Sequence, residues 1–377
     1  MDKYRANFLP HDELQTLLDA LQQAGFACIG PQVSEGAIVY DTITLAEQLP
    51  WGMRDKQAPG EYQLEMIDEK KAFAFSNGPQ AIKPLLFKPA ETVWRVARNP
   101  AGKLEFNPHM AQDPAIAIIG ARACDLAAMV IQDKVFLDNK HPDIHYQARR
   151  SALFVVAVNC TYASNNCFCV SAGTGPNITH SFDILMTELN HGFVIQSGSL
   201  RGEEILATLT LKTATSTQNQ KAKAGVEAAA AMQTKRIPFD NQRQLRDLLF
   251  ANLGHPRWDA VAERCLSCGN CTSVCPTCFC HSEKDKPSLD GTSAEHQREW
   301  DSCFTAGHSE VAGHPIRETT KERYRQWLTH KVGSWFDQFD SSGCVGCGRC
   351  TTWCPVGIDI TEELAAISGE SNIRLPK

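Results

Sequence analysis

Apolar residues in the first half of the chain form one helical repeat and several short β-type runs. Leucines recur every three or four residues from 14 to 21 and Gly25 follows, which predicts a helix over residues 9–25. Short apolar runs predict strands at 26–31, 36–41, 72–78, 115–121, 153–159 and 192–198. A second helix, over 124–138, begins directly after one of these strands. We therefore expect a mixed α/β domain at the N-terminus.

The second half has a different pattern, with helices separated by loops rich in cysteine. Residues 201–234 are rich in Ala, Thr, Gln and Lys and indicate a surface helix or connection. Helical spacing returns in 241–265, where Gly-His-Pro divides two helices, and in 315–339. The predicted fold class is α+β, with a mixed α/β domain over 1–240 and a mainly α-helical domain over 241–377.

The cysteine content distinguishes this chain from an ordinary globular protein. It has 16 cysteines in 377 residues; residues 1–123 contain only Cys28, whereas 265–354 contain eleven. No apolar run approaches the roughly 18–20 residues of a membrane span, and the N-terminus lacks a signal core, so we expect a cytoplasmic protein. Cytosolic thiols serve metal binding or redox chemistry rather than disulfides. The net charge of −6 argues against a general nucleic-acid binder.

The strongest chemical signal is a cysteine pattern that occurs twice. Cys-x2-Cys-x2-Cys-x3-Cys-Pro begins at Cys265 and again at Cys344. Three cysteines at this spacing let a short loop hold three corners of an iron–sulfur cube, and the fourth ligates the other cluster in two-cluster ferredoxins. The pattern predicts two [4Fe–4S] clusters. The first takes Cys265, Cys268, Cys271 and Cys354, and the second takes Cys344, Cys347, Cys350 and Cys275.

Zinc ribbons and a disulfide knot are the alternatives to this interpretation. Zinc sites use two CxxC pairs rather than this spacing, and the repeat favours iron–sulfur clusters. Gly269, Gly346 and Gly348 fit a close approach of the backbone to inorganic sulfide. The 68 residues between the motifs (276–343) have a mainly helical pattern, so the domain is expected to be of the α-helical ferredoxin-like type.

A weaker signal lies in the N-terminal half, where four cysteines follow predicted strands. Cys124 comes just after one strand, Cys160 ends another, and Cys167 and Cys169 follow closely. Because the carboxyl ends of neighbouring strands meet at one edge of a sheet, these four thiols are expected to converge. They predict a third [4Fe–4S] cluster, and buried unligated cysteine is the alternative.

Three further cysteines have no assignment from spacing. Cys278, Cys280 and Cys303, with His281 nearby, indicate zinc, another cluster, or packing around the ferredoxin-type sites. The basic residues of 317–331 indicate a docking face or a solvated helix side. No strand–GxGxxG–helix or P-loop pattern is present, so no nucleotide site is visible, and no catalytic residue is predicted.

The order of these motifs resembles the iron–sulfur β subunit of soluble, cytoplasmic NAD(P)-linked [NiFe] hydrogenases, the sulfhydrogenases. The similar A subunit of anaerobic sulfite reductase shares the same plan. Upstream, GARACD, YQARR, NC and CFC agree in order. The C-terminal segments that carry the resemblance are RCLSCGNCTSVCPTCFC, WDSC, RYRQWLTHK and CVGCGRCTTWCPVGIDITEE.

The resemblance implies an electron-transfer subunit of a four-part oxidoreductase. A flavoprotein partner would bind FAD and NAD(P)H, and large and small [NiFe] hydrogenase subunits would carry the catalytic module. It also favours the third cluster. Each cluster with four thiolates carries roughly −2, so nearby cations are needed; Arg264 and Arg349 adjoin cluster cysteines and are candidates.

Three alternatives to hydrogenase electron transfer stay open at this stage. The same relay can belong to a sulfite or polysulfide reductase complex. The N-terminal cysteines can hold a cluster with an open coordination site, which makes the chain a catalytic enzyme in its own right. A structural zinc protein is the remaining class.

Overall fold

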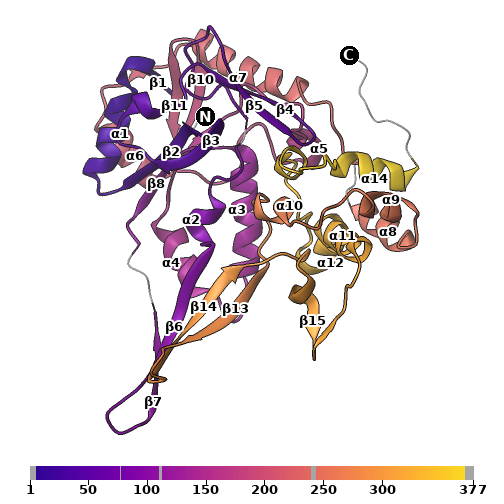
Figure 1. The fold of residues 1–377 in the computed structure, drawn as a ribbon. Helices are drawn as coiled ribbons and strands as arrows, with labels where there is room; N and C mark the ends of the chain where they lie inside the picture. The colour runs from indigo at the N-terminus through magenta and orange to yellow at the C-terminus, as the bar shows by residue number, and fades with distance from the viewer. Residues whose placement is uncertain (1–5, 77, 110–112, 239–242, 370–377) are drawn as a thin grey trace.

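A mixed eight-stranded sheet forms the centre of the N-terminal half (Figure 1). The computed structural model describes residues 6–76, 78–109, 113–238 and 243–369. Strands β2, β8, β9 and β10 pair in parallel at its centre, and antiparallel strands flank them. The order is β12 (Lys212–Thr213), β1 (Asn7–Pro10), β11 (Gly192–Ser197), β10 (Ile184–Leu189), β9 (Phe154–Val158), β8 (Ile116–Ala121), β2 (Ala27–Ser34) and β3 (Ala37–Thr42).

Helices cover both faces of the sheet because its central strands are apolar on both sides. In β9, Phe154 and Val156 face one core while Val155 and Ala157 face the other, and all are buried. The first face packs on α1 (Leu14–Gln23) and α6 (Leu200–Ala207). The second packs on α2 (Lys83–Leu86), α3 (Ala123–Phe136) and α4 (Ile144–Ala152), and α7 (Ser216–Ala231) lies against β10 and β11.

Most elements predicted from apolar periodicity are present. The predicted strands at 26–31, 36–41, 115–121, 153–159 and 192–198 correspond to β2, β3, β8, β9 and β11. The helices predicted at 9–25 and 124–138 correspond to α1 and α3. A mixed α/β fold in this half of the chain is therefore confirmed.

The strand predicted at 72–78 is wrong for the described part of that run. Its backbone groups bond to buried side chains instead of a neighbouring strand. The N–H of Phe73 donates to the Glu188 carboxylate at 2.8 Å, and the carbonyl oxygens of Phe73 and Phe75 accept from Arg122 at 3.1 and 2.9 Å. The apolar side chains are buried without a sheet because these contacts satisfy the backbone.

The C-terminal part packs short helices around an aromatic core. Trp258, Tyr324 and Trp327 are buried there with leucines of the surrounding helices, and Phe168 joins them from the N-terminal half. Among the described helices, none is both long and apolar enough to cross a membrane. The helices are α8 (Arg243–Ala251), α9 (Arg257–Ala262), α10 (Asn270–Ser273), α11 (Thr320–Thr329), α12 (Trp335–Phe339), α13 (Arg349–Thr352) and α14 (Ile360–Ser368).

The segment between the two cysteine motifs is not mainly helical, which corrects the prediction. β13 (His281–Pro287) and β14 (Ser293–Trp300) form a hairpin in it. The hairpin joins β6 (Ala90–Arg98) and β7 (Leu104–Pro108) in an antiparallel sheet of order β13-β14-β6-β7 (Figure 1). Its strands are rich in charged residues and lack apolar alternation, although Asp290-Gly291 at the turn is a hairpin signal.

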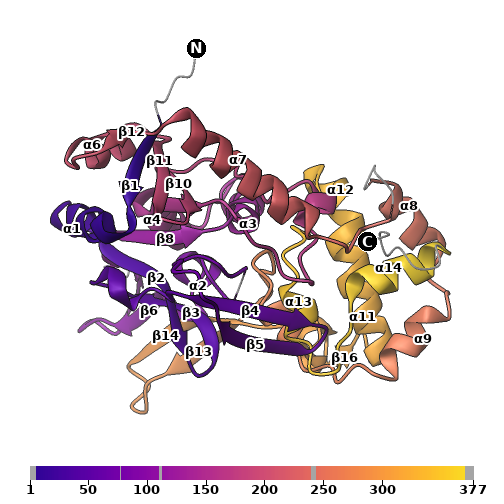
Figure 2. The ribbon, with the colours of Figure 1, turned by 90° about the horizontal axis from the view of Figure 1, so that it is seen from above.

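Two hairpins connect segments from the two sides of the predicted domain boundary. One is β13–β14, which pairs with β6. The other, β4 (Met53–Ala58) and β5 (Glu61–Met66), reaches α13, where the N–H of Gly60 donates to the carbonyl of Thr351 at 3.0 Å (Figure 2). The boundary itself, at residues 240–241, lies outside the described residues, so the division of the chain stays a prediction.

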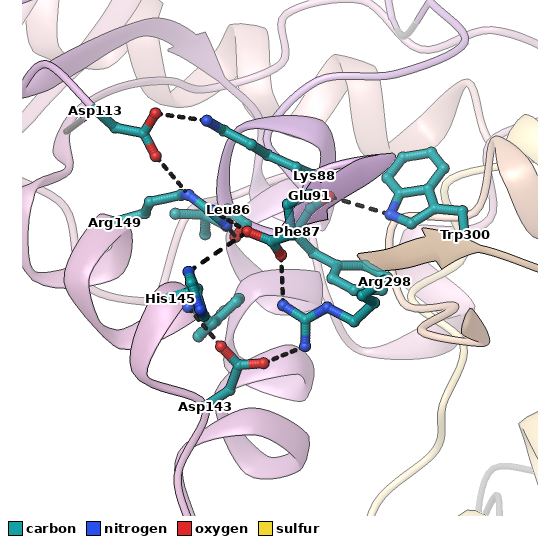
Figure 3. Close-up of polar contacts among 11 residues, drawn as sticks. Leu86, Phe87, Lys88, Glu91, Asp113, Asp143, His145, Arg149, Arg298 and Trp300 are labelled. Atoms are coloured by element: carbon teal, nitrogen blue, oxygen red, sulfur yellow. Dashed lines mark hydrogen bonds and ion pairs between the residues drawn. The ribbon is translucent and has the colours of Figure 1, made fainter. Parts of the chain in front are cut away.

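A network of buried charges holds β14 against β6 and α4 (Figure 3). Glu91 on β6 accepts hydrogen bonds from Arg149 of α4 and Arg298 of β14. Arg298 also pairs with Asp143, and Arg149 donates to Asp113 at 2.8 Å. Burial raises the pKa of Glu91, but the two guanidinium groups lower it by more. One carboxylate therefore joins elements that are about 200 residues apart in sequence.

We expect Glu91→Gln to destabilise the protein by about 3–5 kcal/mol, because it removes the buried anion that two buried guanidinium groups share and leaves each of them with a single carboxylate partner. Urea unfolding followed by circular dichroism measures this. Arg95→Gln is the matched control on the same strand, since the Arg95–Glu295 pair is exposed, and we expect less than about 1 kcal/mol. Equal losses in the two variants would contradict the assignment.

The same carboxylate predicts a pH dependence. Because the pKa of Glu91 is lowered in the folded state, the ionised side chain contributes to folding stability at pH values above its unfolded pKa of about 4.3. This contribution is lost as the pH falls below that value, through the lower folded pKa. The stability difference between wild type and Glu91→Gln should therefore shrink below about pH 4.

Candidate metal centres

Both cysteine motifs fold in the same way. In each, a glycine with positive φ, +77° at Gly269 and +76° at Gly348, precedes a one-turn helix, α10 or α13. The third cysteine of the motif lies in that helix, and the fourth follows within two residues of its end. Glycine adopts this left-handed conformation without the strain that a side chain brings. Each motif thus holds three cysteines on a loop and turn, with the fourth on the segment that leaves it.

The first predicted ligand set is brought together in space. Cys265, Cys268, Cys271 and Cys354 line one cavity, which Cys350 of the other motif also reaches. Burial raises the pKa of the Cys271 thiol, and the nearby charges of Cys265, Cys354 and Cys268 raise it further. Cys354, from the second motif, therefore lies beside the first three cysteines of the first motif.

The second predicted set shows the reciprocal arrangement. Burial, followed by the charges of Cys344, Cys275 and Cys347, raises the pKa of Cys350. Cys275 and Cys344 are buried and the other two are partly buried. The fourth cysteine of each motif thus lies with the first three of the other motif.

A buried lysine lies beside the second set. Nζ of Lys331 donates to Sγ of Cys275 at 3.3 Å and to Oγ1 of Thr277 at 2.9 Å. Lys331 belongs to a π-helical turn (His330–Ser334) between α11 and α12, a feature common at functional sites. Burial lowers its pKa, and the cysteine charges, that of Cys275 first, raise it by more. Sequence reasoning placed Lys331 on a docking face or a solvated helix side, and the structure buries it.

The four N-terminal cysteines lie at the carboxyl ends of β8 and β9. Burial and the charges of Cys167 and Cys160 raise the pKa of Cys169. Burial, Asp125 and then more distant charges, Cys169 among them, raise that of Cys124. The predicted third set is therefore brought together as well.

The loop that carries Cys167 and Cys169 touches the second ferredoxin-type loop through the backbone. The N–H of Phe168 donates to the carbonyl of Gly346 at 2.9 Å. A Cβ added at Gly346 would lie 2.6 Å from the Phe168 carbonyl oxygen, and one at Gly348 would lie 2.2 Å from that of Asn166. These two glycines are therefore needed where another loop approaches.

The second cysteine set adjoins each of the other two: Cys350 reaches the cavity of the first set, and the Gly346 loop contacts the loop of the third. The charge of Cys347, in the second set, acts on both Cys124 and Cys169 of the third. The charge of Cys271, in the first set, acts on Cys350 of the second. The second set is thus the middle one.

Comparison with known proteins agrees with this geometry. Residues 264–358 match the family model of a 4Fe-4S dicluster domain. The chain is also 32% identical over 280 residues to the sulfhydrogenase 2 subunit beta of Pyrococcus furiosus, covering 74% of this chain and 79% of that relative. The chain belongs to the sulfhydrogenase β-subunit family. No solved structure matches it.

The donor set of this sulfhydrogenase β-family chain fits iron–sulfur clusters. Each of the three sets offers four thiols, the ligand type that [4Fe–4S] clusters use. Positive charges are buried against them; besides Lys331, the fully buried Arg122 opposes the rise in pKa that burial causes at Cys160. Among the described residues, no group of three or more His, Cys, Asp or Glu side chains is arranged around a single metal ion.

The two arginines predicted as offsetting cations have different surroundings. Arg349 is buried between the second and third sets and donates to Oδ1 of Asp125 at 2.8 Å. The charges of Asp125, Cys347 and Cys124 raise its pKa, although burial, the largest effect, lowers it. Arg264 is partly exposed and pairs with Glu363 at 2.7 Å. Arg349 is therefore the one that adds a buried charge.

The three unassigned cysteines divide into two groups: Cys278 is hydrogen-bonded to Cys275 of the second set, whereas Cys280 and Cys303 form a pair. Cys280 is hydrogen-bonded to Cys303 and His308. His281, which the sequence placed with these thiols, instead contacts the carbonyl of Phe279 at 3.0 Å. A histidine 28 residues beyond Cys280 carries no local signal, and only the hairpin brings it close. Cys28, in β2, is buried in the strand core.

We expect Gly348→Ala to destabilise the protein by about 2–4 kcal/mol, because its Cβ would overlap the backbone of the Asn166 loop. Gly102→Ala is the matched control: Gly102 has nearly the same φ, +77°, but nothing in the described part of the chain lies within 4 Å of an added Cβ. It should lose only about 1 kcal/mol. Thermal and urea unfolding measure both, and a Gly348→Ala loss no larger than the control would contradict the tight loop contact.

Proposed function

We propose that this chain is the electron-transfer iron–sulfur subunit of a hydrogenase complex. It relays electrons between a subunit that binds FAD and NAD(P)H and a [NiFe] module of small and large subunits. The observation that carries this proposal is that three four-cysteine sets adjoin one another in one chain of the sulfhydrogenase β-subunit family. Several adjoining redox sites, rather than one site in a substrate cleft, are what an electron relay requires.

The proposed ligands follow the groups that the fold assembles. Two [4Fe–4S] clusters would occupy the ferredoxin-type sets, and a third [4Fe–4S] cluster would occupy the N-terminal set. When bound, such clusters supply one-electron transfer at potentials from about −700 to +450 mV. The proposed ligands are Cys265, Cys268, Cys271 and Cys354; Cys344, Cys347, Cys350 and Cys275; and Cys124, Cys160, Cys167 and Cys169.

The polypeptide's own contribution is to hold, shield and electrically balance these sulfurs. Aromatic side chains of the C-terminal core line the cavity of the first set and exclude water from it. Lys331, Arg122 and Arg349 place positive charge in the interior, where a negative cluster would otherwise be costly. A positive charge fixed beside a bound cluster would raise the reduction potential of that cluster, compared with the same site without the charge.

The partners are proposed from the family. The Pyrococcus furiosus relative is named as the β subunit of a sulfhydrogenase, which makes it one part of an assembly. This sequence has no dinucleotide or P-loop pattern, so hydride chemistry is assigned to a flavoprotein partner and hydrogen chemistry to the [NiFe] subunits.

We expect the anaerobically purified chain to contain about twelve iron atoms, because three tetranuclear clusters hold that number. Cys124→Ser should lose about four of them and one component of the EPR spectrum of the reduced protein. Cys354→Ser should lose a different component. Cys28→Ser is the control and should keep full iron content, since Cys28 lies in the strand core of β2.

The same metal analysis can also contradict the proposed clusters. About eight iron atoms, with an unchanged spectrum in Cys124→Ser, would overturn the third cluster. Stoichiometric zinc in place of iron would overturn all three.

We expect the tagged chain to co-purify from native extracts with a flavoprotein and a [NiFe] subunit. Hydrogen gas should reduce this complex, which is measured as a decrease in its visible absorbance. In complexes carrying Cys354→Ser, reduction of the bound flavin by hydrogen should fall at least tenfold while the subunits stay together. Cys28→Ser complexes should behave as wild type. Recovery of a sirohaem protein instead, or turnover by the isolated chain, would contradict the hydrogenase relay.

A further inference from the structure

Two cysteines outside the proposed cluster sets meet at the base of the β13–β14 hairpin. Cys280 directly precedes β13, and Cys303 lies three residues beyond the end of β14. The strands are in register with His281 opposite Trp300, and the N–H of Asp301 donates to the carbonyl of Cys280 at 3.0 Å. The hairpin thereby places the two thiols side by side, with a hydrogen bond between their sulfurs.

An imidazole and a carboxylate extend this pair. His308 is hydrogen-bonded to the sulfur of Cys280, and its Nδ1 lies 3.0 Å from Oδ2 of Asp301. The hydrogen bonds from Cys303 and His308 lower the pKa of Cys280 to about 4, although burial opposes them. The same contact raises the pKa of His308 to about 9. A thiolate next to an oriented imidazolium is the arrangement of an activated cysteine.

Cys280 lies at a cavity of about 270 Å³ that is partly open to solvent. Cys280 and Asp301 line it, together with Cys268 of the first set. Lys83 also lines it, with Nζ 3.8 Å from the centre of the Trp300 ring. A small molecule thus has room beside the sulfur of Cys280 and meets the amino group of Lys83 there.

We propose that Cys280 and Cys303 form a redox-active dithiol that reduces small disulfides in this cavity. The geometry that supports it is the hydrogen-bonded thiol pair, the His308–Asp301 contact and the cavity. The proposal goes beyond electron relay, because it concerns cysteines that the three cluster sets do not use.

The reaction balances without any group besides the two reactants. The Cys280 thiolate attacks one sulfur of the disulfide, which forms a mixed disulfide and releases one thiolate. The Cys303 thiol then passes its proton to the thiolate released first and attacks the sulfur of Cys280, which forms the Cys280–Cys303 disulfide and releases the second thiolate. The protein dithiol loses two electrons, and the small disulfide gains them. A small dithiol, oxidised in turn, restores the pair.

Several groups besides His308 set the charge around the attacking sulfur. Cys280 interacts electrostatically with Lys83, Cys278 and His330, while Lys331 acts on Cys303. Only His308 combines a hydrogen bond to Cys280 with a second contact that orients its ring. Its replacement is therefore the sharpest test of thiolate activation.

The test uses the full-length chain, purified anaerobically, with bis(2-hydroxyethyl) disulfide as the probe. We expect a Cys280–Cys303 linked peptide by mass spectrometry, with two mercaptoethanol molecules released for each chain. Cys303→Ser should stop at the mixed disulfide on Cys280 and release one. Cys280→Ser should form neither product. Dithiothreitol should return the wild-type protein to the dithiol.

The pH dependence separates an activated thiol from a merely accessible one. For the wild type, we expect the rate at pH 6 to stay within about tenfold of the rate at pH 9, whereas an ordinary thiol slows by about a hundredfold. His308→Gln should lose at least tenfold at pH 6 and little at pH 9. His314→Gln, at an exposed histidine in the same region, is the control and should match the wild type.

Two results would overturn the proposal. One is the absence of the Cys280–Cys303 peptide while the probe reacts elsewhere or not at all. The other is loss of about four iron atoms in Cys280→Ser and Cys303→Ser, which would mark both residues as cluster ligands. Neither result bears on the proposed electron-transfer function. Failure of that proposal would be seen separately, as missing iron in the wild-type chain.

Discussion

One backbone contact between two distant loops joins the second cysteine set of this protein to the third. The N–H of Phe168, between two cysteines of the N-terminal half, donates to the carbonyl of Gly346 in the second ferredoxin-type loop. Only glycine fits at 346 and 348 because the other loop occupies the space of a side chain. The contact makes the second cysteine set the middle one of three, which a chain of redox sites needs.

The cost of burying negatively charged sulfur explains why cations are buried beside the cysteine sets. Thiolates in the interior are unfavourable unless cations or hydrogen-bond donors accompany them. Lys331 bonds directly to Cys275, and Arg349 lies between the second and third sets with Asp125 as its partner. These cations come from the C-terminal part, whereas Arg122 comes from the N-terminal half. Both parts of the chain therefore contribute to the balance of charge.

The β13–β14 hairpin connects the charge network to the dithiol. Arg298 on β14 bonds to Glu91 on β6, so the hairpin is held against the N-terminal half. The same end of the hairpin, two residues beyond Arg298, places Cys280 beside Cys303. The electrostatic network and the thiol pair thus lie next to each other at the base of one hairpin.

The sequence by itself determined what depends on neighbours along the chain. Periodic apolar residues predicted β8, β9 and α3, and the repeated cysteine spacing predicted which thiols lie together, because loop geometry follows from short spacing. Only the tertiary structure decided what depends on distant segments. Residues 72–76 are not a strand because buried side chains take up their backbone groups. Lys331 is buried, and His308 rather than His281 reaches Cys280, because packing and strand pairing act across sequence distances that no local pattern records.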